Sequence, residues 1–144
     1  MTQALTFTIR EALAADESVI GELDELARTE GTRHRGASHL HDSLGGFGER
    51  WSARETTLRY TVASIHAEVV GFTTVRLGER PVLEQVFVHA SARGLGVGAA
   101  LLRDAVHRYG ADHLDALSLP GDRLTKNLYE RAGLKARLIV ASAL

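Results

Sequence analysis

The sequence predicts a single domain of the α+β class, built on a mixed but mostly antiparallel sheet with flanking helices. Three observations support this class. Segments that alternate apolar and polar residues, as strands do, are interspersed with segments of helical apolar spacing. Two β-patterned segments, 59–65 and 69–77, are separated by a short polar turn, as in an antiparallel hairpin. The chain shows no internal repeat and no linker, so residues 1–144 are expected to form one domain.

The N-terminal half begins with an expected strand followed by a helix. Residues 5–12 alternate apolar and polar side chains, which indicates the strand. Residues 18–30 space their apolar side chains along one helical face behind Ser18, which we expect to cap the helix. Residues 31–56 are polar and interrupted by glycine. We therefore expect a loop there, with a short helix around Trp51.

The central segment contains three strands and a helix. The two hairpin segments are rich in β-branched residues, which favour strands. Residues 81–88 predict a further strand, with Pro81 at its start, where a missing N–H is tolerated. A glycine-rich stretch, 91–98, follows directly and leads into a helix that ends at about Tyr109.

The C-terminal segment is expected to add a strand, a helix and a last strand. Residues 113–119 have the pattern of a strand. Residues 120–134 predict a helix with Asp122 as its N-cap and Gly133 as its stop signal. Residues 135–144 are rich in apolar and β-branched side chains, which predicts the final strand.

Composition and charge exclude several classes of function. The formal net charge of −1 gives no electrostatic reason to expect nucleic acid as a partner. The chain has no cysteine, which excludes disulfides and thiolate metal sites. It has no apolar run of about 18 residues and no basic-then-apolar leader, which predicts a cytoplasmic protein without a membrane partner. The abundance of arginine and small residues suggests a bacterial source.

The glycine-rich stretch raises the question of what approaches its backbone. Gly94, Gly96 and Gly98 alternate directly before a helix and follow Arg93. A tight strand-to-helix connection is one interpretation. A P-loop is excluded because no Lys-Ser/Thr follows, and the spacing differs from the G-x-G-x-x-G of dinucleotide-binding turns. The remaining interpretation is a pyrophosphate site, because a helix N-terminus presents unpaired N–H groups and Arg93 adds positive charge.

A second motif, GDRLTKNLYERAGL at residues 121–134, follows the glycines at a distance of one strand. The two motifs together resemble the GNAT superfamily of acyl-CoA-dependent N-acyltransferases over about residues 57–134. The resemblance implies the GNAT fold, in which the fourth and fifth strands splay apart around the cofactor. The residues that match the second family motif are Gly121, Leu128, Tyr129, Glu130 and Gly133, with Arg131 replacing a lysine.

The resemblance implies acetyl-CoA as the co-substrate, wedged beside the strand at 81–88. Backbone N–H groups of that strand would bind the pantetheine arm and the thioester carbonyl, while the glycine loop would bind the pyrophosphate. Asp122 stands where the family has an asparagine, and a carboxylate accepts hydrogen bonds but donates none. The cofactor-binding residues implied in this way are Val86, Val88, Arg93, Gly94, Gly96, Gly98, Ala99, Asp122, Lys126 and Asn127.

The resemblance also implies direct attack of an amine on the thioester, with Tyr129 as general acid for the leaving thiolate. Glu84 is the expected base, because several members of the family place a catalytic glutamate at this position. The alternatives are a packed aromatic for Tyr129, and for Glu84 a carboxylate that is paired with Arg76 or Arg80 or is simply solvated. His39, His41 and Asp42 are of metal-binding types, but no further spaced ligand accompanies them, and no metal is expected.

The expected function is therefore N-acetyl transfer from acetyl-CoA to an amine. The alternative is an acyl-CoA-binding sensor or interaction module without catalysis. We expect the acceptor site within residues 28–56, where Trp51 is either core or a substrate platform. The family builds two strands after the position of Gly133, whereas the sequence leaves room for one. We therefore expect the final strand of the usual fold to be missing. The acceptor groove is then either left open at that end or completed by a second subunit, and we predict a homodimer.

Overall fold

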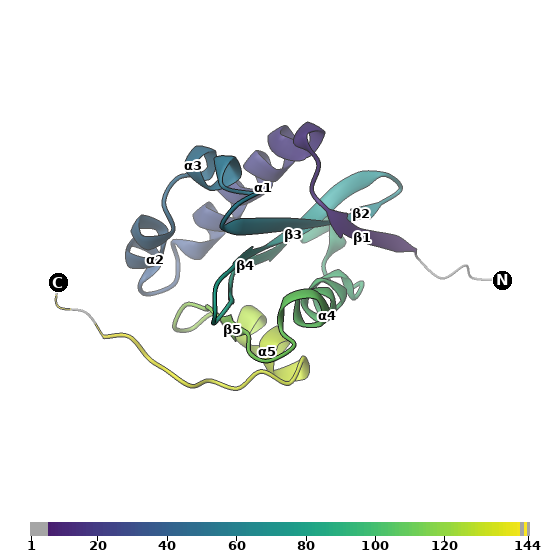
Figure 1. The fold of residues 1–144 in the computed structure, drawn as a ribbon. Coiled ribbons are helices and arrows are strands. Elements are labelled where there is room, and N and C mark those ends of the chain that lie inside the picture. Colours follow the sequence, from purple (N-terminus) through teal and green to yellow (C-terminus); the bar gives the residue numbers. More distant parts are fainter. Residues whose placement is uncertain (1–5, 142, 144) are drawn as a thin grey trace.

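The sheet of this protein has five strands in the spatial order β1-β2-β3-β4-β5. A computed structural model describes residues 6–141 and 143. All neighbouring strands are antiparallel except β4 and β5, which are parallel, so the predicted mixed α+β class is confirmed (Figure 1). The strands are β1 (Phe7–Glu11), β2 (Leu58–Ile65), β3 (Glu68–Arg76), β4 (Val82–Val88) and β5 (Asp115–Ala116). Leu5 of the expected first strand lies outside the described residues.

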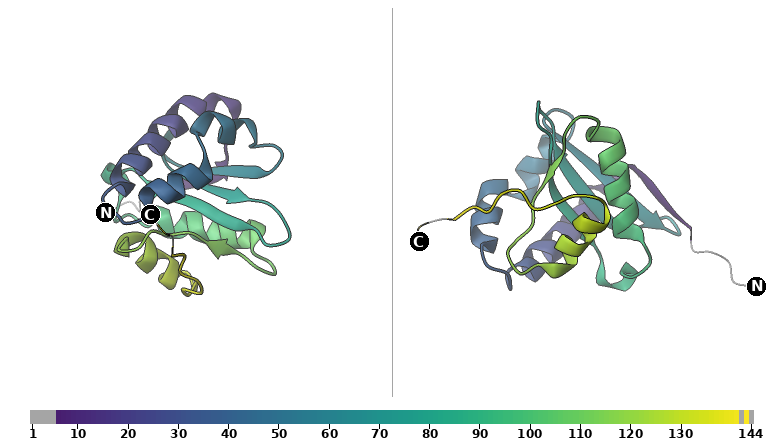
Figure 2. Two further views of the ribbon diagram at one scale, coloured as in Figure 1. Left: turned by 90° about the vertical axis from the view of Figure 1, so that its left-hand side faces the viewer. Right: turned by 90° about the horizontal axis from the view of Figure 1, so that it is seen from below.

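Helices cover both faces of this sheet, three on one face and two on the other (Figures 1 and 2). The first layer consists of α1 (Glu17–Gly31), α2 (Ala37–Leu44) and α3 (Phe47–Ser52). The second layer consists of α4 (Val97–Tyr109) and α5 (Arg123–Arg131). Short 3-10 turns at Ala14–Asp16 and Ala90–Ala92 precede α1 and α4. Within the described part of the chain, no helix has the length and apolar character needed to cross a bilayer.

The apolar core lies between the sheet and each helical layer. On the first face, Ile20 and Leu23 of α1 and Trp51 of α3 pack against Tyr60 and Phe72 of the sheet. Burying a side chain of this size contributes roughly 1.5–3 kcal/mol, so these contacts fix both helices to the sheet. Trp51 is 4% exposed and is therefore a core residue, which leaves no surface for a substrate platform.

The expected splaying of the fourth and fifth strands is present. β4 and β5 pair only at Val82 with Asp115 and at Leu83 with Ala116. Beyond Leu83, β4 continues to Val88 paired with β3 on one side but without a strand on the β5 side. We call this open edge of β4 the β4–β5 gap. The fifth strand is therefore much shorter than the predicted 113–119, because the chain leaves the sheet after a single additional bond, from the Leu117 N–H to the Leu83 carbonyl.

A bulge in β4 lies where the gap begins. Thr74 of β3 is opposite Gln85 and Val75 is opposite Leu83, so Glu84 is an extra residue without a partner in the ladder. A bulge of this kind bends its strand and increases the local twist. The bulge and the end of the β4–β5 pairing thus coincide at residues 83–84.

The loop predicted for 31–56 is wrong, because α2 and α3 both lie in this segment. Gly36 and Gly45, each with φ of 85°, flank α2 rather than interrupt a long loop. Between them α2 buries Ala37 and Leu44, which supply its tertiary packing. The short helix expected around Trp51 is confirmed as α3.

The N-terminal cap expected at Ser18 is also wrong. Helix α1 begins at Glu17, so Ser18 lies inside its first turn and Asp16 occupies the N-cap position. The carboxylate of Asp16 does not cap the helix through a side-chain bond. It accepts instead from the Leu13 N–H at 2.7 Å and from both terminal nitrogens of Arg10.

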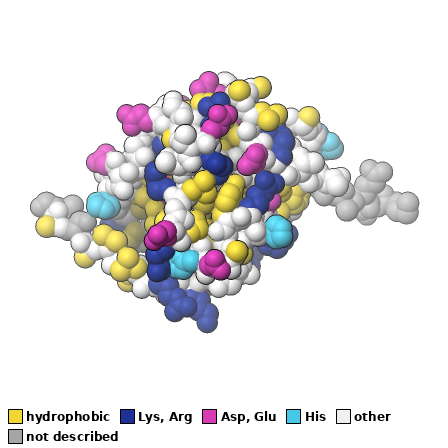
Figure 3. Space-filling model, viewed as in Figure 1, with side chains coloured by type: hydrophobic (Ala, Val, Ile, Leu, Met, Phe, Trp, Pro, Cys, Tyr) yellow, Lys and Arg dark blue, Asp and Glu magenta, His cyan; other side chains and the backbone are white. Residues whose placement is uncertain are grey.

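The strand predicted for 135–144 does not form in residues 135–141 and 143, and residues 142 and 144 lie outside the described residues. Strand-like composition is not sufficient, because a strand needs an edge to pair with, and β5 offers only two residues. Leu138, Ile139 and Val140 are consequently 83%, 87% and 67% exposed. Hydrophobic side chains are visible along this C-terminal segment in Figure 3, at the lower left.

Candidate functional site

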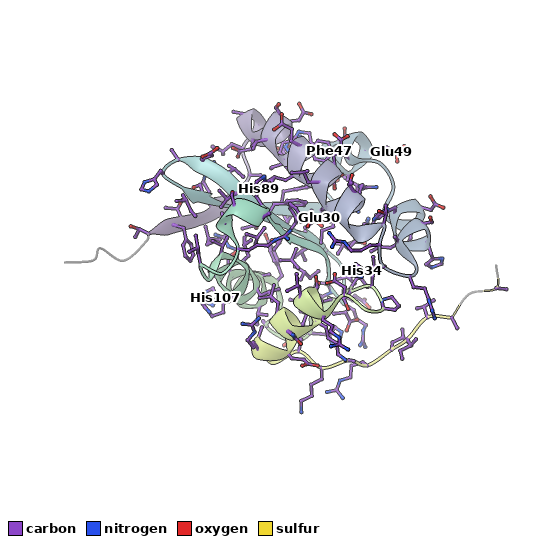
Figure 4. All side chains as sticks on the ribbon, turned by 180° about the vertical axis from the view of Figure 1, so that it is seen from behind. Glu30, His34, Phe47, Glu49, His89 and His107 are labelled. Atoms are coloured by element: carbon purple, nitrogen blue, oxygen red, sulfur yellow. The ribbon has the colours of Figure 1, made fainter. Side chains whose placement is uncertain are left out.

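A groove of about 630 Å³ runs across the carboxyl-terminal half of β4. One wall comes from α1 and α2, and the other from α5 and the chain that precedes it. Glu30 at the end of α1 and His34 in the following turn lie on the first wall, on the side of the molecule seen in Figure 4. The glycine loop and the start of α4 close one end of the groove.

The N-terminus of α4 supplies backbone donors to this groove. Gly94 and Gly96 adopt left-handed φ angles of 81° and 87°, which are rarely accessible to other residues, and Gly96 is the N-cap of α4. Ala100 donates to the Gly96 carbonyl, so the N–H groups of the three residues before Ala100 have no partner within the helix. Such N–H groups, at the positive end of a helix dipole, can bind an anion.

Gly98 serves a different purpose from the first two glycines. A Cβ atom on Gly98 would lie 3.1 Å from a methyl group of Leu128, which is tighter than an ordinary contact. The missing side chain thus lets α5 pack closely against α4. The three glycines satisfy two requirements, a left-handed turn at the first two and close helix packing at the third.

Arg93 is already engaged with neighbouring groups. Its Nη2 donates to both carboxylate oxygens of Glu30 at 2.9 Å, and its Nε donates to the Val88 carbonyl at 3.0 Å. The guanidinium also lies over the ring of Phe87, 5.5 Å from its centroid. Arg93 therefore links the glycine loop to α1, and its expected contact with a pyrophosphate stays a prediction.

The open edge of β4 presents backbone groups to the groove. The His89 N–H donates to the Val70 carbonyl of β3, whereas the Val88 carbonyl accepts from the side chain of Arg93. Backbone groups of successive strand residues alternate between the two edges of a strand. The peptide groups of Val86 and Val88 therefore face away from β3 and into the β4–β5 gap, as expected for residues that bind a thioester.

Tyr129 lies on the inner face of α5 and is 7% exposed. Its hydroxyl donates to the Leu117 carbonyl at 2.6 Å, at the point where the chain has just left β5. Burial raises the pKa of Tyr129 above its ordinary value, so the hydroxyl is protonated at neutral pH. Tyr129 packs in the cluster that contains Leu102 of α4.

Glu84, the predicted base, lies in the groove between two arginines. Its Oε1 accepts from Arg50 at 2.9 Å and its Oε2 accepts from Arg76 at 3.1 Å. The pairing with Arg76 confirms one of the alternatives considered for this residue. Arg80 is not a partner, because its guanidinium contacts His113 at 3.0 Å.

Arg50 is the centre of a buried polar network that the sequence did not reveal. Its side chain is 2% exposed and also donates to Thr74, Gln85 and the Leu44 carbonyl. Consecutive residues of a regular strand point to opposite faces, so one arginine could not bind both Glu84 and Gln85. The bulge at Glu84 removes this restriction.

The network continues to α1 through Asp24, which is 3% exposed. Gln85 donates to one Asp24 oxygen at 2.8 Å, and Arg28 donates to the other at 2.8 Å. Arg28 also donates to the Gly45 carbonyl after α2. The only signal in the sequence is an acidic residue on the apolar face of an amphipathic helix, next to Leu23.

Two histidines line the groove beside this network, His34 and His41. Burial lowers the pKa of His41, and the neighbouring Arg28 lowers it further. His39, two residues before His41 on α2, is exposed and does not line the groove. Within the described residues, no three His, Cys, Asp or Glu side chains come close enough together to hold a metal ion.

Most of the predicted cofactor residues line the groove, but two do not. Lys126 and Asn127 are exposed and lie outside the groove lining. Asp122 caps α5 as predicted, with Oδ1 accepting the Thr125 N–H and Oδ2 accepting the Thr125 hydroxyl. The residues of the prediction that the groove brings together are Glu84, Val86, Val88, Arg93, Gly94, Gly96, Gly98, Ala99, Asp122 and Tyr129.

The model of the acetyltransferase (GNAT) family matches residues 20–134. The chain belongs to this family. The match includes the groove, the glycine loop and the tyrosine helix, and it confirms the family that the two motifs indicated. None of the curated proteins matches the sequence significantly.

Solved structures show the same GNAT fold at low sequence identity. A transcriptional regulator from Bacillus halodurans C-125 is 24% identical, with 96% of this chain and 99% of that chain covered and a TM-score of 0.69. A ribosomal-protein-alanine N-acetyltransferase from Brucella melitensis biovar Abortus 2308 is 18% identical, with the same coverage and TM-score. AAC(6′)-Iy, in complex with the bisubstrate analog CoA-S-monomethyl-acetylneamine, is 19% identical with a TM-score of 0.67, covering 96% of this chain and 99% of that chain.

Proposed function

We propose that this protein transfers an acetyl group from acetyl-CoA to an amine. The observation that carries the proposal is the anion site at the start of α4, which opens into the same groove as the open edge of β4. A pyrophosphate bound by the N–H groups of Val97, Gly98 and Ala99 would direct a pantetheine arm into the β4–β5 gap. The family match over residues 20–134 supports the same ligand.

In the proposed reaction, the N–H groups of Val86 and Val88 polarise the thioester carbonyl. Such donors stabilise the negative charge that develops on the oxygen as the amine attacks. The bond from the amine nitrogen to the carbonyl carbon forms, and the carbon–sulfur bond breaks. Tyr129 would donate its hydroxyl proton to the departing thiolate, since burial holds the phenol protonated beside the gap.

The charges of the groove favour an acceptor that is not a polycation. The carboxylates of Glu30, Glu84 and Asp122 already accept from protein donors. Arg33 and Arg123 of the lining are exposed, and within the described residues no carboxylate lies within ion-pair distance of Arg123. We propose an amine that also carries an anionic group, such as an amino acid or a peptide N-terminus with acidic residues.

The test mixes the protein and acetyl-CoA with a panel of amines and measures the release of free thiol. The panel contains amino acids, short peptides with acidic or basic residues, polyamines and aminoglycosides. We expect thiol release with at least one amine, and faster release with anionic acceptors than with polyamines. Tight binding of acetyl-CoA without thiol release for any amine would contradict catalysis and favour an acyl-CoA-binding sensor.

We further propose that the protein forms a homodimer in solution. Three consecutive apolar side chains, Leu138, Ile139 and Val140, are exposed on the segment after α5. A second copy would cover them, whereas a monomer leaves them in water. Light scattering at micromolar concentration is expected to give twice the chain mass of 15.6 kDa, and a monomeric mass would contradict the proposal.

A further inference from the structure

The identity of the base is the unanswered part of the proposed reaction. An amine with a pKa near 10 is almost fully protonated at neutral pH, so it must lose a proton before it attacks the thioester. Glu84 is poorly placed for this purpose, because each of its oxygens accepts from a guanidinium. Glu30 binds Arg93 through both oxygens, and Asp122 caps α5 through both oxygens.

The histidines are the remaining proton acceptors in the groove lining. Within the described residues, neither the His34 nor the His41 imidazole makes a hydrogen bond to another protein group. His34 lies in the turn after α1, against Gly121 at the start of α5. His41 lies on α2, beside the network that joins α1 to β4 through Asp24 and Gln85.

The ring of His41 is accessible because Gly31 has no side chain. A Cβ atom on Gly31 would lie 3.6 Å from Nε2 of His41 and 3.7 Å from a methyl group of Leu119. All three residues line the groove. Leu119 lies two residues after Leu117, whose carbonyl accepts from Tyr129. The imidazole therefore lies near Gly31 and Leu119 in the lining of the groove that Tyr129 also lines.

We propose that His41 is the base that takes the proton from the acceptor amine, directly or through one water. The proposal rests on the proposed acetyl transfer. His41 takes one proton from the ammonium group, and the resulting amine attacks the carbonyl carbon. As the carbon–sulfur bond breaks, the attacking nitrogen loses its second proton, and the thiolate that leaves receives a proton from Tyr129. One of the two nitrogen protons restores the Tyr129 hydroxyl, and the other passes to solvent. The sum is amide, free coenzyme A thiol and one released proton.

The surroundings of His41 favour the form that can accept a proton. Burial and Arg28 of α1 both act against a charged imidazole and lower the pKa of His41. Asp24 of α1 and Asp42 of α2 act in the opposite direction, but the net pKa shift is downward. His41 is therefore neutral at pH 7, whereas a base held in the charged state could not act.

The decisive experiment compares the pH dependence of kcat in four single variants, using the best amine of the panel. His41→Gln should lower kcat at least tenfold at neutral pH and remove the acidic limb of the profile. His39→Gln, on the same helix but outside the groove, is the matched control and should leave rate and profile unchanged. Glu84→Gln and His34→Gln should both retain the acidic limb. We use kcat because it reports ionisations within the enzyme–substrate complex.

Retention of the acidic limb in His41→Gln would overturn the proposal. Loss of the acidic limb in Glu84→Gln or His34→Gln instead would assign the base to that residue.

A further variant keeps the His41 imidazole but covers its Nε2 atom. Gly31→Ala places a methyl group against Nε2 at an ordinary contact distance and does not disturb the helix. We expect a lower kcat without loss of stability. An unchanged kcat would contradict an amine approaching Nε2.

A measurement without turnover separates this proposal from the proposed function. A pH titration of the imidazole signals by NMR, with coenzyme A bound, should place the midpoint of His41 below the ordinary histidine value of about 6.5. A midpoint at or above that value would overturn the proposal even if no amine were acetylated. Coenzyme A binding without thiol release, together with a low midpoint, would overturn the acetyl transfer on which the proposal rests.

Discussion

The two halves of the groove are built in different ways. The donor half, formed by the glycine loop, the start of α4 and the open edge of β4, presents backbone N–H groups. The acceptor half, formed by α1, α2 and residues 84–85 of β4, presents side chains held by a buried polar network. Backbone groups suit a ligand common to a whole family, because they do not depend on side-chain identity. Side chains suit the part that differs among relatives.

The two halves also differ in what holds them in place. Local turns fix the donor half, since Gly94 and Gly96 need only their left-handed conformations. Side-chain hydrogen bonds between segments far apart in the sequence fix the acceptor half. Arg50 and Glu84 are 34 positions apart, and Asp24 and Gln85 are 61 positions apart. A substitution in the donor half should therefore act mainly on ligand binding. One in the acceptor network should act mainly on folding.

The largest expected effect is that of Arg50→Met. Removing Arg50 leaves Glu84 paired with Arg76, which is partly exposed, and takes a donor away from Thr74, Gln85 and the Leu44 carbonyl. We therefore expect a loss of about 3 kcal/mol in the free energy of unfolding. Chemical denaturation measures it. Arg76→Met is the matched control, because Arg76 binds the same carboxylate but is 42% exposed. It should cost less than about 1 kcal/mol. Equal losses of unfolding free energy in the two variants would show that the buried network does not hold the acceptor half in place.

The second prediction concerns Tyr129→Phe. If the phenol protonates the leaving thiolate, turnover should fall roughly a hundredfold or more, while the dissociation constant of acetyl-CoA changes little. Steady-state thiol release and calorimetric titration measure the two quantities. The variant also leaves the Leu117 carbonyl without its donor, which costs about 1 kcal/mol of stability. Unaltered turnover would show that Tyr129 is a packing residue only.

A smaller effect is expected for Gly96→Ala in the donor half. An alanine forced into a left-handed conformation costs roughly 1–2 kcal/mol, and relief of that strain would turn the N–H groups of α4 away from the groove. Coenzyme A should therefore bind several-fold more weakly, as measured by calorimetry. Gly78→Ala, at a turn with φ of 155° far from the groove lining, is the control and should leave affinity unchanged. Equal coenzyme A affinities in the two variants would show that the N-terminus of α4 does not bind the anion.

The smallest effect is the pH dependence of stability that His41 contributes. Its pKa is lower in the folded protein than in the unfolded chain, so the unfolded state binds more protons as the pH falls through that range. This contribution is complete above the ordinary value of about 6.5 and is lost at lower pH. Urea midpoints at about pH 7.5 and 5.5 should differ more for the wild type than for His41→Gln. A larger difference between the two urea midpoints in His41→Gln than in the wild type would contradict the predicted sign of this contribution to stability.

The donor half could be predicted from the sequence because its signals are local. The spacing of Gly94 and Gly96 before an amphipathic helix encodes the left-handed turn at the start of α4, and Asp122 and Tyr129 belong to one capped helix. Gly98 belonged to the same pattern, but its contact with Leu128 joins two helices. The purpose of that glycine therefore appears only in three dimensions.

The acceptor half could not be predicted, because its partners are far apart in the chain. Arg50 stands among polar residues, and nothing in the local pattern shows that it is buried beneath the sheet edge. The glycines of 31–56 have the same appearance in a loop as they do at helix ends. In the C-terminal segment the prediction was wrong in the opposite way, because a strand was expected where none forms. Leu138–Val140 have strand propensity but no strand edge to pair with.

The bulge at Glu84 joins the two halves, because it is held by Arg50 and marks the end of the β4–β5 ladder. Beyond the bulge, the backbone groups on the open edge of β4 have no strand to pair with, so water must bind them when no ligand is present. In the proposed function, a pantetheine arm, which carries amides of its own, would take the place of the absent strand and complete the sheet. At a concentration one hundred times its dissociation constant, such a ligand adds about 2.7 kcal/mol to the stability of the fold. Binding of the proposed cofactor would then stabilise the fold as well as supply the acetyl group.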